Sequence, residues 1–225
     1  MKYWFHGTNE YFVEWGQPPV RSRYKPELVV HPFVCLTKSK PLALGASEET
    51  GGLARAFLLD AARVIDYRQS TTETKTIWNE LRATETGSRH PGMSSHDAWL
   101  QACKTGIALR PAMTSLEQMQ DMQVFHGQTY SSPSQKIAAV LRLQNATREW
   151  INAVISPAQR LGYDAVICAE TDKRNGGTAC VNLHVFNANV LSAPEWLVQP
   201  NEDDIRAADE WADAAFPEIA RGGTA

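Results

Sequence analysis

The stretch Lys2–Phe12, KYWFHGTNEYF, places the triplet His6-Gly7-Thr8 directly after a run of aromatic residues. The aromatic residues favour a buried β-strand over Tyr3–Phe5. Glycine weakens the interior of a strand, and it often marks a bulge or a place where a ligand approaches the backbone. A histidine before such a glycine would lie beside that ligand. The alternative is a buried, hydrogen-bonded histidine followed by a glycine that begins a turn, and the triplet alone does not decide between them.

The composition is that of an ordinary globular protein. The chain has 225 residues, 43% of them hydrophobic and 21% charged, and a formal net charge of -3. This charge gives no indication of nucleic-acid or membrane binding. The apolar runs are too short and too interrupted to span a bilayer, and no apolar leader follows Met1-Lys2. The four cysteines lie far apart without a CxxC pair, so we expect a cytoplasmic protein with neither a metal site nor a disulfide framework.

Further along the chain, short apolar runs alternate with helical patterns. Strands are expected in the run that ends at Thr37–Ser39 and at the close of the segment 53–67, although periodicity would also allow a helix in that segment. A short helix is expected after Lys40-Pro41. The segment 132–163 predicts an amphipathic helix broken by Pro157. The apolar runs 163–170 and 179–187 flank the turn signal Asn175-Gly176 and predict a hairpin.

These patterns indicate a single domain over residues 1–200. A mostly helical insertion is expected at 70–130, where polar residues surround Trp78 and Trp99. An acidic helix and tail, whose charged face would be solvated, is expected at 201–225.

Three motifs, in the order WFHGT, FVCLTKSKPLALGAS and LGYDAVICAE…VNLHVFN, together resemble the ADP-ribosyltransferase fold in its diphtheria-toxin-like branch. The resemblance covers residues 2–67 and 160–192. It implies an α+β fold, a split β-sandwich of two small packed sheets. It also implies an enzyme that takes NAD as its substrate, cleaves the nicotinamide–ribose bond and transfers ADP-ribose to a macromolecule.

The resemblance gives the first motif a role in binding NAD. His6 would hydrogen-bond a ribose hydroxyl, and Gly7 would offer its backbone to the nicotinamide carboxamide, an approach that a side chain would block. Thr8 would add a hydroxyl contact or act as a turn residue.

The second motif contributes Thr37 and Ser39, whose hydroxyls would position a ribose or a catalytic side chain. Helix capping ahead of Pro41 is the alternative. The family often has a tyrosine after this motif that stacks on nicotinamide, and none stands here. Phe33 or Tyr67 could supply that ring.

The last motif departs from the family at its catalytic glutamate. That residue stands four positions before the phenylalanine, and Phe186 places it at Asn182. An asparagine can hydrogen-bond the ribose but carries no charge to offset the cation that develops as nicotinamide leaves. Glu170, across the predicted hairpin, could supply the carboxylate, and His184 shares the face of Asn182 by strand alternation. The candidate catalytic residues are therefore Asn182, Glu170 and His6.

We expect a protein as the acceptor of ADP-ribose, although nucleic acid is not excluded. By analogy with the family, the chain would be a bacterial or phage effector or toxin. Two alternatives remain: a catalytically dead relative that binds NAD or a protein, and an RNA 2'-phosphotransferase-like enzyme. The second requires arginines in the cleft, and the sequence shows no evident basic patch.

Overall fold

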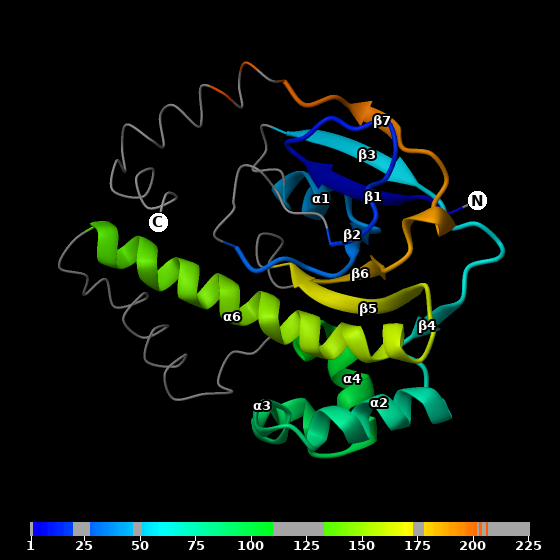
Figure 1. Ribbon diagram of the computed structural model, residues 1–225. Helices are drawn as coiled ribbons and strands as arrows, with labels where there is room; N and C mark the ends of the chain where they lie inside the picture. The colour runs from blue at the N-terminus through cyan, green and yellow to red at the C-terminus, as the bar shows by residue number, and fades with distance from the viewer. Residues whose placement is uncertain are drawn as a thin grey trace.

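The computed structural model describes residues 2–19, 28–46, 51–109, 133–172, 178–201, 203 and 206. At its centre is a seven-stranded sheet in the order β4-β5-β6-β2-β1-β3-β7 (Figure 1). Neighbouring strands are antiparallel except β4 and β5, which are parallel. A mostly antiparallel sheet with separate helices fits the α+β class. The strands are β1 (Trp4–Thr8), β2 (Val34–Thr37), β3 (Gly52–Ala56), β4 (Val64–Asp66), β5 (Ala165–Asp172), β6 (Thr178–Val185) and β7 (Glu195–Val198).

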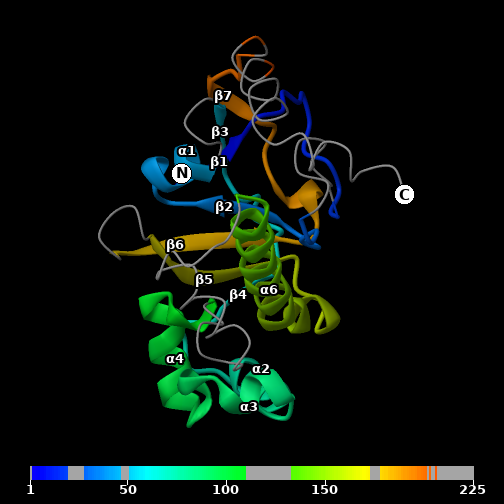
Figure 2. The same cartoon turned by 90° about the vertical axis from the view of Figure 1, so that its left-hand side faces the viewer.

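The helices lie in two places. The short α1 packs beside β1, whereas the long α6 crosses β5 and β6, with α2, α3 and α4 below it (Figures 1 and 2). Short 3-10 turns connect several of these elements. The helices are α1 (Lys40–Ala46), α2 (Thr72–Arg82), α3 (Glu85–Arg89), α4 (His96–Thr105) and α6 (Pro133–Arg160).

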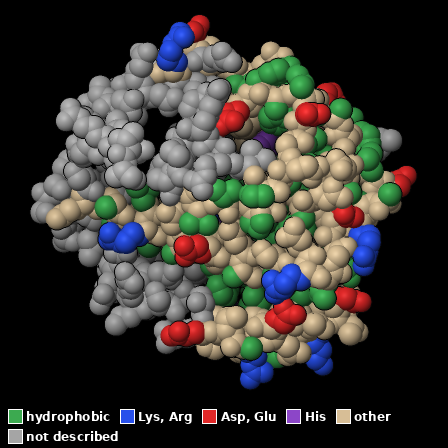
Figure 3. All heavy atoms as spheres, in the orientation of Figure 1, with side chains coloured by type: hydrophobic (Ala, Val, Ile, Leu, Met, Phe, Trp, Pro, Cys, Tyr) green, Lys and Arg blue, Asp and Glu red, His purple; other side chains and the backbone are tan. Residues whose placement is uncertain are grey.

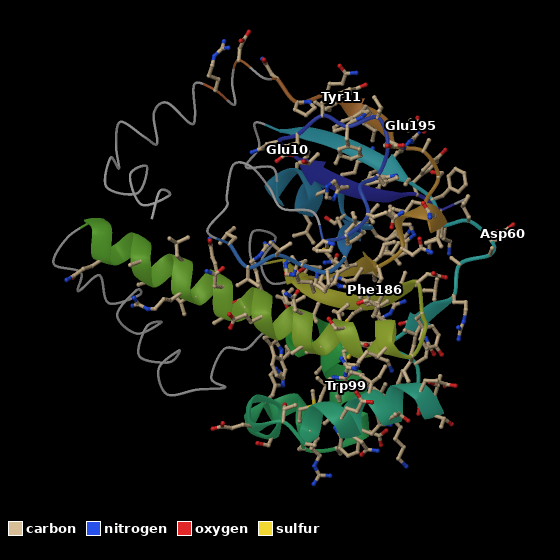
Figure 4. The ribbon with its side chains drawn as sticks, in the orientation of Figure 1. Glu10, Tyr11, Asp60, Trp99, Phe186 and Glu195 are labelled. Carbon is tan, nitrogen blue, oxygen red and sulfur yellow. The ribbon has the colours of Figure 1, made fainter. Side chains whose placement is uncertain are left out.

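The chain between β4 and β5 carries most of the helices. Parallel neighbours need a crossover connection, and residues 67–164 form it. The side chains of this crossover share one hydrophobic core with the sheet. Figure 4 labels two of its members, Trp99 on α4 and Phe186 at the end of β6. Other members are Tyr67, Ile77, Trp78, Leu109, Trp150, Val154, Ile155, Val166 and Cys168.

The sheet has a seam between β1 and β2. These two strands pair at Phe5 and Thr37, whereas β1 pairs with β3 from Trp4 to Thr8. Figure 2 shows β2, β6 and β5 lying across the view and β1 and β3 at a steep angle to them. A second, smaller core fills the face of the sheet opposite the helices, with Trp4, Leu36, Ala56, Leu183 and Val185 among its members.

The segment 53–67 forms two strands, and the helical interpretation of its first half is wrong. Residues Gly52–Ala56 form β3, which is buried at every position except Arg55. A strand buried on both faces is apolar at nearly every position, so it loses the alternation that would distinguish it from a helix. The predicted strand at the end of the segment is confirmed as β4.

The predicted break at Pro157 is also wrong, because α6 continues to Arg160. A proline inside a helix removes a backbone donor and disturbs the carbonyls of the preceding turn. Here the Tyr67 hydroxyl donates to the carbonyl oxygen of Val154 at 3.1 Å. The bond ties the helix to the end of β4 beside the proline, and it does not replace the donor that the carbonyl of Ala153 loses.

The hairpin is confirmed, since β5 and β6 pair antiparallel along their length. Its turn at Asn175-Gly176, residues 110–130 of the insertion, and all but 201, 203 and 206 of the acidic tail lie outside the described residues. Among the helices that the structure describes, none combines the length and the apolar character needed to cross a membrane.

Candidate functional site

Three of the candidate residues meet on one face of the sheet. Asn182 on β6 lies opposite Thr37 on β2 and opposite Cys168 on β5. Residues opposite one another in antiparallel strands share a face, and Glu170 stands two positions beyond Cys168 on that face. The hairpin therefore brings Glu170 beside Asn182, as strand alternation predicts.

Asn182 and Glu170 form a direct hydrogen bond. The Asn182 side-chain nitrogen Nδ2 donates to Glu170 Oε2 at 2.7 Å. A carboxylate accepts hydrogen bonds, so this contact fixes the orientation of the amide and leaves Asn182 Oδ1 as an acceptor. That oxygen is buried and has no partner. Asn182 is 1% exposed, and an unpaired acceptor at such a depth is costly unless a donor reaches it.

The hydroxyls of the second motif serve the local structure. Ser39 Oγ accepts the backbone N–H of Leu42 at 3.2 Å, which makes Ser39 the cap of α1, as the capping alternative predicts. Thr37 Oγ1 accepts the N–H of Ser39 at 3.2 Å and contacts the carbonyl oxygen of Val181 at 3.4 Å. Thr37 nevertheless lies directly beside Asn182 in the sheet register.

His6 lies one strand away from this group. It alternates with Phe5, which shares a face with Thr37, so its side chain leaves the other face of β1. His6 Nδ1 lies 2.8 Å from the carbonyl oxygen of Cys35 and must carry the proton, which leaves Nε2 as an acceptor. Burial lowers the pKa of His6 and keeps the ring neutral. The ring also packs edge-on against Trp15, with 5.5 Å between ring centroids.

Gly7 and Thr8 have structural explanations. The strand β1 continues through Gly7 without a break. A Cβ atom at Gly7 would lie 1.7 Å from the carbonyl oxygen of Ala43, so α1 can pack on β1 because this residue has no side chain. A valine there would displace the helix, and the loss of binding in such a variant would not identify a ligand contact. Thr8 Oγ1 accepts the N–H of Glu10 at 3.1 Å and acts as a turn residue.

The two aromatic rings considered for stacking on nicotinamide are enclosed in the protein. Phe33 is 5% exposed, and its ring lies against His31 and His184. Tyr67 has no exposed surface and belongs to the core beneath α6. Neither ring presents an open face to a ligand in this conformation.

His184 is an unusual buried residue on the face of Asn182. It is 1% exposed, and neither ring nitrogen has a hydrogen-bond partner. Burial, together with the charge of nearby His31, lowers the pKa of His184 to about 3. Burial likewise lowers the pKa of His31 to about 4, and its Nδ1 lies 2.5 Å from Asn152 Oδ1. Both rings are therefore neutral at physiological pH.

Sequence reasoning missed the polar contacts between α6 and the segment 28–33, which we call the strap. Asn145 Oδ1 accepts the N–H of Val29, and Arg148 Nε donates to the carbonyl oxygen of the same residue. Asn152 Nδ2 donates to the carbonyl oxygen of Val30 at 3.0 Å. These three α6 side chains follow a helical spacing, but their partner is the backbone of a distant segment, which no motif reveals.

The GYDA motif has a structural role in this chain. The Asp164 carboxylate accepts the backbone N–H of Arg63 at 2.9 Å and the Asn187 side-chain amide at 3.0 Å. Through these bonds it joins the start of β4 to the end of β6. The motif therefore fixes the sheet that carries Asn182 and Glu170, and it contributes none of their chemistry.

Known proteins provide no relative from which the site could be assigned. No family model, curated protein or solved structure gives a significant match to the chain. In the part of the chain that the structure describes, no three His, Cys, Asp or Glu side chains are grouped to hold a metal ion.

Proposed function

We propose that the protein is an NAD-dependent ADP-ribosyltransferase whose catalytic centre is the Asn182–Glu170 pair. The observation that carries the proposal is the 2.7 Å hydrogen bond between these residues, together with the unpaired Asn182 Oδ1. The motifs of the ADP-ribosyltransferase fold place a glutamate at the position of Asn182. In this chain a carboxylate from the neighbouring strand lies next to that position.

The pair can perform two tasks in cleaving the nicotinamide–ribose bond. Asn182 Oδ1 is a buried acceptor, and the 2'-hydroxyl of the nicotinamide ribose is a donor of suitable chemistry. The Glu170 carboxylate holds the amide in that orientation and places a negative charge close to the ribose as positive charge develops on it. A preorganised group that stabilises a developing charge contributes about 2.7–4 kcal/mol, or 10²–10³ in rate.

The seam between β1 and β2 supports the finer proposal of a split β-sandwich, since the sheet turns where these strands pair at Phe5 and Thr37. His6 lies beside this seam, but its side chain leaves the face of β1 opposite to that of Asn182, so His6 would not contact the ribose that Asn182 binds. We place the NAD-binding site on the face of the sheet that carries Thr37, Asn182 and Glu170.

The face drawn in Figure 3 favours a protein as the acceptor. On the face shown in Figure 3, lysines and arginines are scattered singly among acidic residues and do not gather into a patch. Nucleic-acid binding depends on such patches, so this distribution favours a protein over RNA or DNA as the acceptor.

Incubation of the protein with cell lysate and NAD labelled in its adenylate part tests the proposal. We expect free nicotinamide and labelled protein, which mass spectrometry would identify as ADP-ribosylated. Nicotinamide release with free ADP-ribose as its sole counterpart would indicate a glycohydrolase. NAD binding without any cleavage would indicate a non-catalytic relative and contradict the proposal.

A further inference from the structure

Arg148 on α6 is a half-buried cation that has no acidic partner in the described part of the chain. No carboxylate among the described residues forms an ion pair with it, and its Nε donates a hydrogen bond to the carbonyl oxygen of Val29 at 2.5 Å. Burial lowers the pKa of Arg148. A partly desolvated charge is unfavourable unless an opposite charge compensates it, and the described residues supply no such counter-charge to this guanidinium.

The strap uses only one of the hydrogen-bond donors of Arg148. Asn145 and Asn152 already bind the strap backbone on either side of the Arg148 bond. A guanidinium has five N–H donors, of which the strap engages the one on Nε. The terminal NH₂ groups make no hydrogen bond within the described part of the chain. They form the planar fork that matches a phosphate or carboxylate group.

Arg148 faces the same side of the sheet as the catalytic pair. Cys35 on β2 lies two residues before Thr37 and therefore on the face of Thr37 and Asn182. The raised pKa of the Cys35 thiol arises from burial first and from the charge of Glu170 second, while the charge of Arg148 opposes both. The charges of Glu170 and Arg148 thus both act on the same thiol, one from β5 and one from α6.

We propose that Arg148 binds the pyrophosphate of the dinucleotide whose nicotinamide ribose contacts Asn182. This inference rests on the proposed function. The pyrophosphate carries two negative charges and would approach a centre that already holds the Glu170 carboxylate. A cation on α6 offsets that repulsion, and its terminal NH₂ groups provide two parallel hydrogen bonds.

Calorimetry with a set of partial ligands tests the inference. The probes are NAD, ADP-ribose, inorganic pyrophosphate and nicotinamide riboside, the last of which lacks the pyrophosphate. In Arg148→Gln we expect the affinities for NAD and ADP-ribose to fall about 10- to 100-fold, the range for a hydrogen bond to a charged group. The affinity for nicotinamide riboside should stay unchanged. Arg148→Lys, which keeps the charge without the fork, should give an intermediate loss.

Two matched variants separate this role from the folding of α6. Asn152→Ala removes strap contacts and keeps Arg148, so it should not weaken ADP-ribose relative to nicotinamide riboside. Arg160→Gln removes another α6 arginine, which pairs with Glu80, and should leave all four affinities unchanged. If Arg148→Gln fails to fold, the comparison of Arg148→Lys with Asn152→Ala decides the question.

The outcomes distinguish this inference from the proposed function. NAD cleavage by the unaltered protein, with equal ADP-ribose affinity in a folded Arg148 variant, would overturn the inference and leave the function standing. Pyrophosphate binding that depends on Arg148 in a protein that binds no NAD would support the anion site and contradict the function. A protein that binds none of the four probes would overturn both.

Discussion

The hydrogen bond between Asn182 and Glu170 should make a measurable contribution to stability. Its length of 2.7 Å and its charged acceptor place it among the strong hydrogen bonds, which contribute about 1.5–3 kcal/mol. A double-mutant cycle of Asn182→Ala and Glu170→Ala isolates the free energy of interaction between the two side chains, because the contributions of their other contacts cancel. We expect a coupling energy of about 1.5–3 kcal/mol. Glu170→Gln, which keeps the shape but removes the charge, should retain roughly half of it.

Urea unfolding followed by tryptophan fluorescence provides the measurement, since the chain contains seven tryptophans. The midpoint and the slope of each transition are compared, because a changed slope would indicate an altered unfolded state. A coupling energy below about 0.5 kcal/mol, the range found for independent sites, would refute the argument. It would mean that the two side chains do not interact in solution, and the proposed catalytic pair would lose its basis.

Three further predictions concern the surroundings of the site. Gly7→Ala should destabilise the protein by about 1–3 kcal/mol in thermal or urea unfolding, because the Cβ of the alanine would overlap the carbonyl of Ala43. Unchanged stability would contradict the packing of α1 on β1. Ser39→Ala should cost about 0.5–2 kcal/mol through the lost cap, and a loss of NAD affinity beyond that effect would show that the hydroxyl also binds ligand. His184 stays neutral in the folded protein down to about pH 3, whereas the unfolded chain protonates near pH 6.5, so the unfolded state binds more protons below pH 6.5. The free energy of unfolding should therefore fall as the pH drops from 6.5 towards 3. In His184→Phe the dependence of this free energy on pH should be smaller by up to about 1.4 kcal/mol per pH unit. An unchanged pH dependence in that variant would contradict a buried neutral His184.

The contact between Asn182 and Glu170 was predictable from the sequence because it depends on a local rule. The turn signal at Asn175-Gly176 predicts that 163–170 and 179–187 pair as a hairpin, and the alternation of side chains then places Glu170 near Asn182. The resemblance to the ADP-ribosyltransferase motif, whose glutamate stands four positions before its phenylalanine, implies the choice of Asn182.

The environments of Gly7 and Arg148 could not be predicted in the same way. The requirement for glycine at Gly7 comes from Ala43, which reaches it because α1 docks on β1. Arg148 acquires its position through the strap, which lies more than a hundred residues earlier in the chain. Contacts of this kind depend on tertiary packing and leave no periodic pattern in the sequence.

Local patterns also misled where packing overrides propensity. Pro157 predicts the end of a helix, but α6 continues to Arg160 and packs against the core beside Tyr67. The strand β3 lacks the usual alternation because both of its faces are buried. In both cases a partner distant in sequence determines the local structure.

The release of nicotinamide from NAD by the purified protein tests the central claim most directly. We predict that the unaltered protein releases nicotinamide, and that Asn182→Ala and Glu170→Gln each lower the rate about 10²- to 10³-fold while the folded structure persists. Far-ultraviolet circular dichroism of each variant serves as the control for folding. No release by the folded, unaltered protein, or a rate in both variants equal to that of the unaltered protein, would contradict the account.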